Sequence, residues 1–417
     1  MLTGRRFQVE FTEEQAVFAE QIGGACRSVW NTGLEQRREY RRRGAWMNYQ
    51  PQAKELVEAK AEHPWLKDVP GHCLQQTLMD LDRACRDHGT WKVRWRSGRR
   101  WVPSFRFPEG NKMVVEKLNR RHGRVKLPKL GWVKFRLSRS LKGAVIRSAT
   151  LTREGRHWFV SFLVDDGVEA PGVHAVAGTT VGVDRGVAAA IATSEGDLID
   201  RHFLTAGEQR RAVVLQRTLS RTAKRGRNRD KARTALAEIR RRERQRRQDF
   251  NAQTAHRLAR ANAVVVLEGL KTKNMTRSAK GTIDQPGRNV RAKSGLNRAI
   301  LDKGWHQFEL ALASAARYTG TTVVKVPAAY TSQRCSHCGH VDPKSRESQA
   351  VFRCTSCHQC EHADVNAANN ILAAGLAVTA CEDPDRPSGC SGLSKQEPAG
   401  TRKEVLLHTR TAAAPAA

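Results

Sequence analysis

The most constraining feature of the chain is a set of four cysteines near its carboxy terminus, within the stretch 331–372. Cys335 and Cys338 form one Cys-x2-Cys pair, and Cys354 and Cys357 form a second pair after 15 intervening residues. Two such pairs at this separation are typical of a zinc ribbon, in which four thiolates hold one structural Zn²⁺. The spacing therefore predicts a small zinc-bound fold, but it does not specify an activity.

The same stretch contains further side chains that can bind zinc, so the ligand set stays open at this level. Asp364 follows Cys357 by seven residues and opens an alanine- and asparagine-rich run, ADVNAANNIL. An aspartate in that position is either a helix N-cap or a functional acid. The additional candidate zinc ligands are Cys360, His337, His340, His358 and His362.

Charge indicates the kind of partner that the chain binds. Its 417 residues include 73 Lys and Arg against 41 Asp and Glu, a formal net charge of +32. Such an excess predicts a polyanionic partner, most simply nucleic acid. The sequence has neither an apolar run of about 18 residues nor a basic, apolar leader, so membrane spanning and secretion are not expected. We expect a cytoplasmic, nucleoid-associated protein of a bacterium, with its cysteines reduced.

The amino-terminal part of the chain predicts a strand followed by helices. Residues 5–12 alternate apolar and polar side chains, as a half-buried strand does. Thr12 and Gln15 have the spacing of a capping box, which predicts a helix that runs to about Arg43. Residues 51–88 predict further helix, interrupted at two prolines.

A change of composition near Trp91 indicates a β-rich region over about 91–166. Between Lys92 and Lys142 the chain has 17 basic residues and two acidic ones, with aromatic side chains interleaved. A sheet of this kind either grips a phosphate backbone or is an antiparallel barrel with a polar exterior. The candidate nucleic-acid contacts are Trp91, Trp95, Trp101, Arg94, Arg96, Arg99 and Arg100.

The carboxy-terminal half alternates predicted strands and helices after a linker. A basic segment with helical leucine spacing contains 16 basic and three acidic residues. The predicted elements are a linker at 167–178, two strands separated by a turn at 194–197, the basic helical arm at 209–247, a strand ending at Glu268, a mobile loop at 271–295, a helix at 296–318, and a strand at 321–332.

Three acidic residues occupy positions where a carboxylate is unusual or structurally prominent. Asp184 lies inside an apolar strand, Glu268 ends a strand, and Asp364 begins a helix. Each has an ordinary structural explanation on its own. Metal-dependent hydrolysis of a phosphodiester, however, needs carboxylates that converge from rigid elements to hold Mg²⁺, commonly two ions about 3.5–4 Å apart. The order of elements makes such convergence a testable hypothesis.

The chain resembles the TnpB (OrfB) proteins of insertion sequences and the related compact type V CRISPR effectors. The resemblance rests on the segments GVDRGVAAAIA, VVVLEGL, LNRAILDKGWHQFELAL, YTSQRCSHCG and FRCTSCHQCEHADVNAANNIL. It implies a multidomain α/β protein with an RNase H-like (RuvC) nuclease domain, a zinc ribbon inserted before its last helix, and a wedge β-barrel that carries a helical recognition insert. It also implies a guide RNA, a double-stranded DNA target beside a short flanking motif, catalytic Mg²⁺ and structural Zn²⁺.

The resemblance places the catalytic acids at Asp184, Glu268 and Asp364, and the zinc ligands at the four paired cysteines. His358 departs from the family pattern, because a glycine usually follows that cysteine. The expected parts are the wedge barrel at 1–12 and 91–166, the helical insert at 13–90, the nuclease domain at 178–330 and 361–376, the zinc ribbon at 331–360, and a disordered tail at 377–417.

Three other functions compete with that of a transposon-encoded RNA-guided nuclease. One is a guided DNA-binding repressor whose nuclease domain is silent. Another is a CRISPR-associated type V effector, and the third is a transposase that itself joins DNA strands. The three intact acids favour an enzyme over a repressor.

Overall fold

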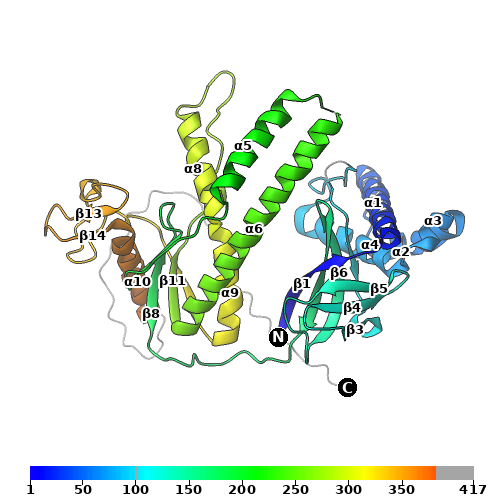
Figure 1. The fold of residues 1–417 in the computed structure, drawn as a ribbon, viewed down its shortest axis with the longest axis horizontal. Helices are drawn as coiled ribbons and strands as arrows, with labels where there is room; N and C mark the ends of the chain where they lie inside the picture. Colours follow the sequence, from blue (N-terminus) through cyan, green and yellow to red (C-terminus); the bar gives the residue numbers. More distant parts are fainter. Residues whose placement is uncertain (99–100, 225, 382–417) are drawn as a thin grey trace.

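The computed structural model describes residues 1–98, 101–224 and 226–381, which form two lobes (Figure 1). One lobe contains a seven-stranded sheet and four helices, and the other contains a five-stranded sheet, its helices and a small cysteine-rich unit. Helix α10, which is the last one in the described residues, extends through Cys381, so the start of the expected tail is helical. The rest of that tail lies outside the described residues.

The seven-stranded sheet is antiparallel throughout, as the alternating pattern of the first half predicted. Its strand order is β2-β6-β7-β1-β5-β4-β3. In the described part of the chain no strand pairing joins the edge strands β2 and β3, so closure into a barrel stays a prediction. The strands are β1 (Leu2–Glu10), β2 (Ser104–Phe107), β3 (Val114–Lys117), β4 (His122–Leu127), β5 (Gly131–Arg136), β6 (Val145–Glu154) and β7 (His157–Asp165), with a short 3-10 turn η1 (Gly110–Lys112) before β3.

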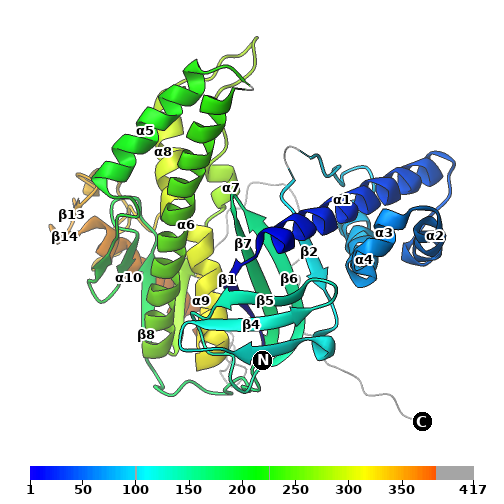
Figure 2. The same cartoon turned by 45° about the vertical axis from the view of Figure 1, so that its right-hand side comes forward.

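Four helices lie between β1 and β2 in the chain and project from this sheet (Figure 2). The predicted capping box is present, because the Thr12 side chain accepts from Gln15 N–H and the Gln15 side chain accepts from Thr12 N–H. The interruptions at the two prolines are also confirmed. The helices are α1 (Glu13–Arg42), α2 (Tyr49–Glu62), α3 (Pro64–Asp68) and α4 (Gly71–His88).

The predicted β-rich region starts later than expected, because the first strand after the helices begins at Ser104. The described residues before it follow α1 instead of a neighbouring strand. Asn31 and Trp30 on α1 bond to the backbone of Arg96 and Arg94, respectively. These side chains bond to backbone groups that a neighbouring strand would otherwise bond. The alternation of aromatic and basic residues therefore predicted a strand where the chain instead follows a helix.

The five-stranded sheet has the order β10-β9-β8-β11-β12, in which β8, β11 and β12 are parallel. The predicted turn at 194–197 is present between β9 and β10. The segment expected to be one strand before that turn is divided into two, because the chain reverses direction after Asp184. The strands are β8 (Thr180–Asp184), β9 (Ile191–Thr193), β10 (Leu198–Ile199), β11 (Val264–Glu268) and β12 (Thr322–Val326).

The predicted basic arm is a pair of helices, α5 (Ala206–Arg221) and α6 (Arg227–Ala261). The single helix predicted at 296–318 is divided at Gly304, whose φ of +71° lies in the left-handed region that glycine tolerates. The expected loop at 271–295 already contains helix. The helices concerned are α7 (Thr272–Met275), α8 (Val290–Lys303) and α9 (Trp305–Thr319).

The two faces of the five-stranded sheet are covered by different helices (Figure 1). Val181, Val183, Val265 and Leu267 pack with side chains of α6 and α9. Val266 packs with Ile371 of α10 (Ala363–Cys381) on the opposite face. Since successive residues of a strand point to opposite faces, Asp184 and Glu268 belong to the α10 face.

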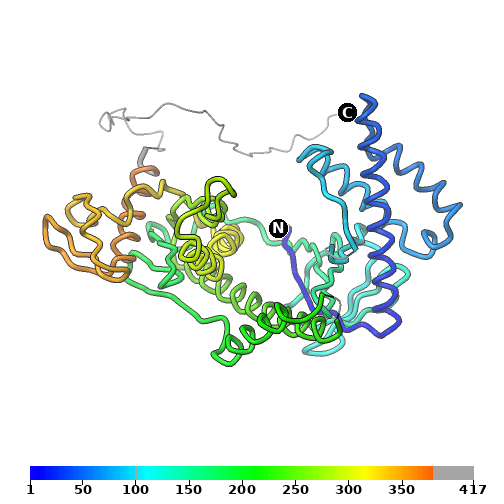
Figure 3. The backbone as a smooth tube through the Cα atoms, turned by 90° about the horizontal axis from the view of Figure 1, so that it is seen from above, coloured from blue at the N-terminus to red at the C-terminus, as the bar shows by residue number. Residues whose placement is uncertain are grey.

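Polar contacts join the two lobes along α6 and α9, which lie between the two sheets in the view from above (Figure 3). Arg244 on α6 is 2.8 Å from Glu154, and the Tyr318 hydroxyl on α9 donates to Asp166 at 2.7 Å. No helix in the described part of the chain is both long and apolar enough to cross a membrane.

We predict that Gly182→Ala destabilises the lobe that contains the five-stranded sheet. A Cβ at Gly182 would lie 2.1 Å from the carbonyl oxygen of Ala368 on α10, and backbone cannot move aside as a side chain can. Overpacking of this kind costs about 1–3 kcal/mol. Thermal unfolding followed by circular dichroism should show a lower Tm. The control is Gly24→Ala on α1, where a Cβ meets nothing within 4 Å. An equal loss in both variants would contradict the prediction.

Candidate functional site

Asp184 and Glu268 lie at the same edge of the five-stranded sheet, at the carboxyl ends of the adjacent parallel strands β8 and β11. The residues immediately before them, Val183 and Leu267, are register partners. Both side chains belong to the face that α10 covers. Asp364 is the second residue of α10 and is buried, so it is not an N-cap outside the helix. A Cβ at Gly186, just beyond β8, would lie 3.3 Å from Asp364 Oδ2.

The electrostatics of Asp184 indicate that the three carboxylates interact. Burial, together with the negative charges of Glu268 and Asp364, raises the pKa of Asp184 to about 7, although the Arg346 guanidinium opposes this rise. Burial also raises the pKa of Glu268. Asp364 Oδ2 is buried and has no hydrogen-bond partner. The site thus brings carboxylate oxygens and their negative charge together, and the Arg346 guanidinium balances only part of that charge.

Several residues that the sequence did not single out hold these acids in place. Thr331 donates a short hydrogen bond to Glu268 Oε1. Arg185 is buried, donates to the Glu268 carbonyl, and forms a 3.2 Å ion pair with Glu309. Among these residues, only Arg185 could have been noticed in the sequence, because it is a charged residue directly after Asp184 in an apolar segment.

Arg346 is the most consequential of the residues that sequence reasoning missed. It caps the 3-10 turn η2 (Pro343–Ser345) inside the cysteine-rich unit, and its Nη2 lies 3.0 Å from Asp364 Oδ1. A guanidinium from this unit therefore reaches the acidic site. No motif identified it, because its sequence neighbours are ordinary loop residues.

The four paired cysteines converge, as predicted. Their sulfur atoms all lie within 4.8 Å of one another, with 3.7 Å between Cys335 and Cys357 and 3.5 Å between Cys338 and Cys354. Tetrahedral zinc with Zn–S bonds of about 2.3 Å separates its sulfurs by about 3.8 Å. A disulfide would bring two sulfurs to about 2.05 Å. The spacing thus fits a four-thiolate metal site.

The remaining candidate ligands lie apart from this cluster. In the described part of the chain, the four cysteines are the one group of potential metal ligands that converges in this way. Cys360 lies on β14 (Cys360–His362), which pairs with β13 (Val351–Arg353). His362 Nδ1 instead accepts from the backbone N–H of Asp364. His358, where the family has glycine, adopts φ +58° and so keeps the glycine-like turn.

Asparagines of α10 attach the cysteine unit to the helix that carries Asp364. Asn366 Oδ1 accepts from Ser336 N–H, and Asn366 Nδ2 donates to the Arg334 carbonyl. Asn370 also donates to the Arg334 carbonyl and to the Thr331 carbonyl. The asparagine-rich run after Asp364 is therefore explained by satisfaction of buried backbone groups next to the first knuckle.

The predicted nucleic-acid contacts differ in their availability. Trp91, Trp95 and Arg94 are exposed. Arg96 is half-buried against the rings of Trp30 and Trp101, and burial lowers its pKa to about 10. The remaining candidates, Arg99 and Arg100, lie outside the described residues.

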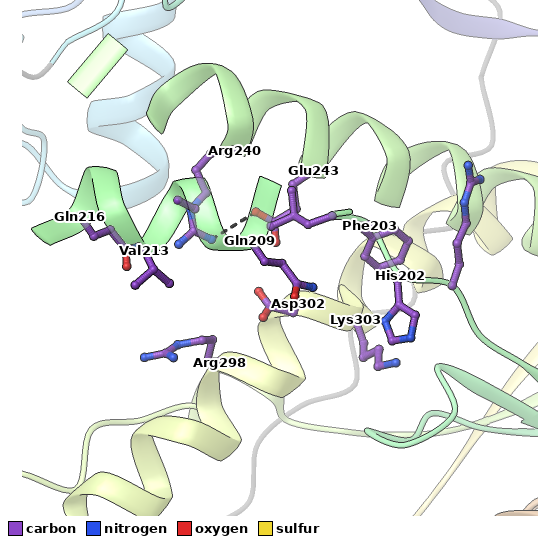
Figure 4. A pocket seen from close by; sticks show the side chains of 13 residues that line it. His202, Phe203, Gln209, Val213, Gln216, Arg240, Glu243, Arg298, Asp302 and Lys303 are labelled. Carbon is purple, nitrogen blue, oxygen red and sulfur yellow. Dashed lines mark hydrogen bonds and ion pairs between the residues drawn. The ribbon is translucent and has the colours of Figure 1, made fainter. Parts of the chain in front are cut away.

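A separate hollow of about 530 Å³ lies between α5, α6 and α8 (Figure 4). Its lining carries both signs of charge, including Arg298, Lys303 and Asp302. Glu243 is buried there and accepts from Arg240 at 3.2 Å. None of the three acids described above lines it, so it is distinct from the carboxylate site.

Comparison with known proteins gives matches over most of the chain. Residues 164–279 match the OrfB_IS605 family model, described as "Probable transposase", and residues 305–371 match a "Cas12f1-like, TNB domain" model. Residues 1–45 match a model described as a helix-turn-helix domain. In the structure those residues form β1 followed by the single helix α1.

Two curated relatives cover nearly the whole chain. "Putative RNA-guided DNA endonuclease InsQ" of Escherichia coli K12 is 39% identical over 90% of this chain and 93% of its own length. "Putative RNA-guided DNA endonuclease" of Streptomyces pristinaespiralis is 31% identical over 94% of this chain and 96% of its own length. The fold is similar to that of a Cas12f1 protein in an sgRNA–target DNA complex, with a TM-score of 0.54, 14% identity, and coverage of 87% of this chain and 83% of that one.

We predict that Cys335→Ser removes bound metal whereas Cys360→Ser does not. Cys335 belongs to the four-sulfur cluster, and Cys360 lies outside it on the adjacent strand. A structural zinc site contributes on the order of 10 kcal/mol of apparent binding free energy, so its loss should also destabilise the unit. Elemental analysis of the purified variants measures the metal. Full zinc content in Cys335→Ser, or none in the unmodified protein, would refute the four-cysteine site.

We predict a pH-dependent gain in stability for Asp184→Asn in buffer containing a chelator. The unfolded carboxyl loses its proton near 3.8, and the folded one near 7. Between these values the folded protein keeps a proton that the unfolded chain has lost, so the free energy of unfolding falls as pH rises. The fall approaches about 1.4 kcal/mol per pH unit and stops above about pH 7.

Denaturant unfolding at pH 5 and pH 8 tests this prediction. Asparagine cannot ionise, so its advantage over aspartate should be larger at pH 8. The control is Glu195→Gln at the exposed turn after β9, which should change stability equally little at both values. An Asp184→Asn advantage that is the same at pH 5 and pH 8 would exclude the raised pKa.

Proposed function

Because the chain belongs to the IS605 OrfB (TnpB) family, related to Cas12f, we propose that it is a metal-dependent DNA endonuclease guided by RNA. The observation that carries this proposal is that Asp184 and Glu268 end adjacent parallel strands and that the charges of both Glu268 and Asp364 act on Asp184. The names of the two full-length curated relatives support it. A silent repressor would not need the buried carboxylates of Glu268 and Asp364 to act on the carboxylate of Asp184.

The architecture supports the expected RNase H-like nuclease domain. In chain order, the strands β8 to β12 have the sheet order 3-2-1-4-5, with parallel pairing of the first, fourth and fifth strands. Asp184 and Glu268 lie at the carboxyl ends of the adjacent parallel strands β8 and β11, where the parallel strands of an α/β sheet commonly present functional side chains. We assign this domain to residues 178–330 and 361–376, with the ribbon at 331–360 inserted.

The donor set fits Mg²⁺. All three candidate ligands are carboxylates, the oxygen donors that Mg²⁺ prefers. Asp364 Oδ2 is buried without a hydrogen-bond partner. Burial and then the charges of Glu268 and Asp364 raise the pKa of Asp184, so a bound cation would stabilise its ionised form. When bound, Mg²⁺ would supply activation of the attacking water and stabilisation of the leaving oxygen.

Residues around the acids would orient them and complete the electrostatics. Thr331 fixes Glu268 Oε1 through a hydrogen bond, and the other carboxylate oxygen, Oε2, would be the one to bind a metal ion. Arg185 ties the end of β8 to the Glu268 carbonyl. Arg346 sits against Asp364, so its guanidinium is in place to contact a phosphate oxygen of DNA once a metal ion balances the carboxylates.

The nucleic-acid partners follow from charge and from the relatives. The net charge of +32 favours a polyanion, and the similar Cas12f1 structure is that of an sgRNA–target DNA complex. We propose that the lobe at 1–12 and 91–166, with its helical insert at 13–90, binds guide RNA and the DNA flank. Base pairing with the guide would select the target, and the protein would identify a short flanking motif.

We further propose that the four-cysteine cluster holds one structural Zn²⁺. The zinc ion would act by fixing positions. The cysteine unit is bonded to α10 through Asn366, and its own Arg346 contacts Asp364 in the acidic site. The ribbon would thus fix Asp364 and Arg346 relative to β8 and β11.

The proposed function is tested with single alanine variants of Asp184, Glu268 and Asp364 in complex with copurified RNA. Each should lower Mg²⁺-dependent cleavage of guide-matched DNA by more than the roughly 10–100-fold that loss of a second-shell partner causes. Guided DNA binding should persist, because recognition lies in the other lobe. A cleavage assay and a binding assay on the same complex measure both.

Glu195→Ala serves as the control, because it removes an exposed acid from the same lobe. It should leave cleavage unchanged. Undiminished cutting by Asp184→Ala, with contaminating nuclease excluded, would remove the proposed site. A wild-type complex that binds matched DNA without cutting it would instead support the repressor.

A further inference from the structure

The carboxy-terminal end of α1 and the segment at 91–97 together expose three tryptophan rings beside arginines. Trp91 is 57% exposed, Trp95 is 42% exposed and Trp46 is 53% exposed. Single exposed apolar residues are ordinary, but three large rings gathered around one helix end are not. These rings and the arginines that contact them are called the Trp–Arg surface below.

The arginines of this surface come from one face of α1. Arg38, Arg41 and Arg42 are spaced i, i+3 and i+4, so their side chains emerge side by side. The Arg38 guanidinium carbon lies 4.9 Å from the Trp95 ring centroid and 5.8 Å from that of Trp91. Arg42 reaches Trp91 at 5.9 Å, and Arg41 reaches Trp46 at 3.7 Å.

The exposure of the rings is not needed to anchor the segment. Buried contacts already anchor it, because Val93 packs in a core with Trp30 and its carbonyl accepts from Arg38 Nη2 at 2.9 Å. Asn31 makes a pair of hydrogen bonds with the backbone of Arg96. The segment is therefore attached to α1 by these buried contacts, while Trp91 and Trp95 keep much of their surface in solvent.

We propose that the Trp–Arg surface binds unpaired nucleotides, whose bases stack on Trp91, Trp95 and Trp46 while the arginines contact the phosphates. Stacking on aromatic rings tolerates any base, since every base has a π-face, and duplex bases are already stacked on one another. Prepositioned rings and arginines lower the ordering cost of binding. This inference rests on the proposed nucleic-acid function and specifies where a single-stranded segment is held.

The structure also narrows the earlier candidates for such contact. Arg96 and Trp101 lie half-buried and contact each other, so they support the segment instead of presenting themselves to a ligand. Arg38, Arg41 and Arg42 of α1 take their place beside the exposed rings. Guide RNA and a displaced DNA strand share the chemistry of unpaired nucleotides, so both are tested.

The experiment measures affinity for labelled single-stranded RNA, single-stranded DNA of the same sequence, and their duplexes. The double variant Trp91→Ala/Trp95→Ala should lose at least about tenfold in affinity for one or both single strands and little for duplex. Trp91→Phe/Trp95→Phe should recover part of the loss, because it keeps an aromatic face. A larger loss of affinity for RNA assigns the surface to the guide, and a larger loss for DNA assigns it to the displaced strand.

The matched control is Trp65→Ala on α3, a ring that is 47% exposed and contacts His63 instead of an arginine. It should leave all affinities unchanged, and circular dichroism should verify the fold of every variant. Equal affinities in the double variant and the control, or an equal loss for duplex, would overturn the inference. Guided cleavage by the wild-type complex is assayed in parallel, so failure of this surface is distinguishable from failure of the nuclease proposal.

Discussion

The close packing of α10 against β8 is the contact on which the acidic site depends. Gly182 has no side chain, so the backbone of α10 at Ala368 approaches the strand directly. Gly375 on α10 in turn leaves room for the Val266 side chain of β11. These two approaches set the distance between helix and sheet, and Asp364 at the start of α10 is carried with them to the edge where Asp184 and Glu268 lie.

The same helix links the site to the cysteine unit. Asn366 and Asn370 hold the backbone that enters the first knuckle, and Arg346 returns from the unit to Asp364. A metal bound by the cysteines would therefore stabilise the unit that holds the start of α10 and places Arg346 against Asp364. Small units of this size lack a core large enough to be stable alone, as its few buried side chains, Phe352 and Ala363 among them, illustrate.

Like charges close together oppose folding, and the site tolerates this through its surroundings. Asp184 keeps its proton to near neutrality when no cation is present, while Arg185 and Arg346 balance part of the charge. Such unfavourable electrostatics are characteristic of functional sites, because a structural role would be served as well by neutral side chains. Because the arginines balance only part of the carboxylate charge, a cation is expected at this edge of the sheet.

The amino-acid sequence by itself predicted the cysteine cluster and most elements, because these follow from local spacing and periodicity. The joint role of the three acids was implied by the family resemblance and stays a proposal. Thr12 capped α1 and Glu268 ended its strand as expected, whereas Asp184, expected inside a strand, ends β8 because the chain reverses direction there. The sequence placed the first strand of the basic region too early and treated α8 and α9 as one helix. Only the tertiary structure decided which faces met. Arg346 reached Asp364 and Arg38 reached Trp95 through contacts between segments far apart in the chain, and local patterns carry no record of such contacts.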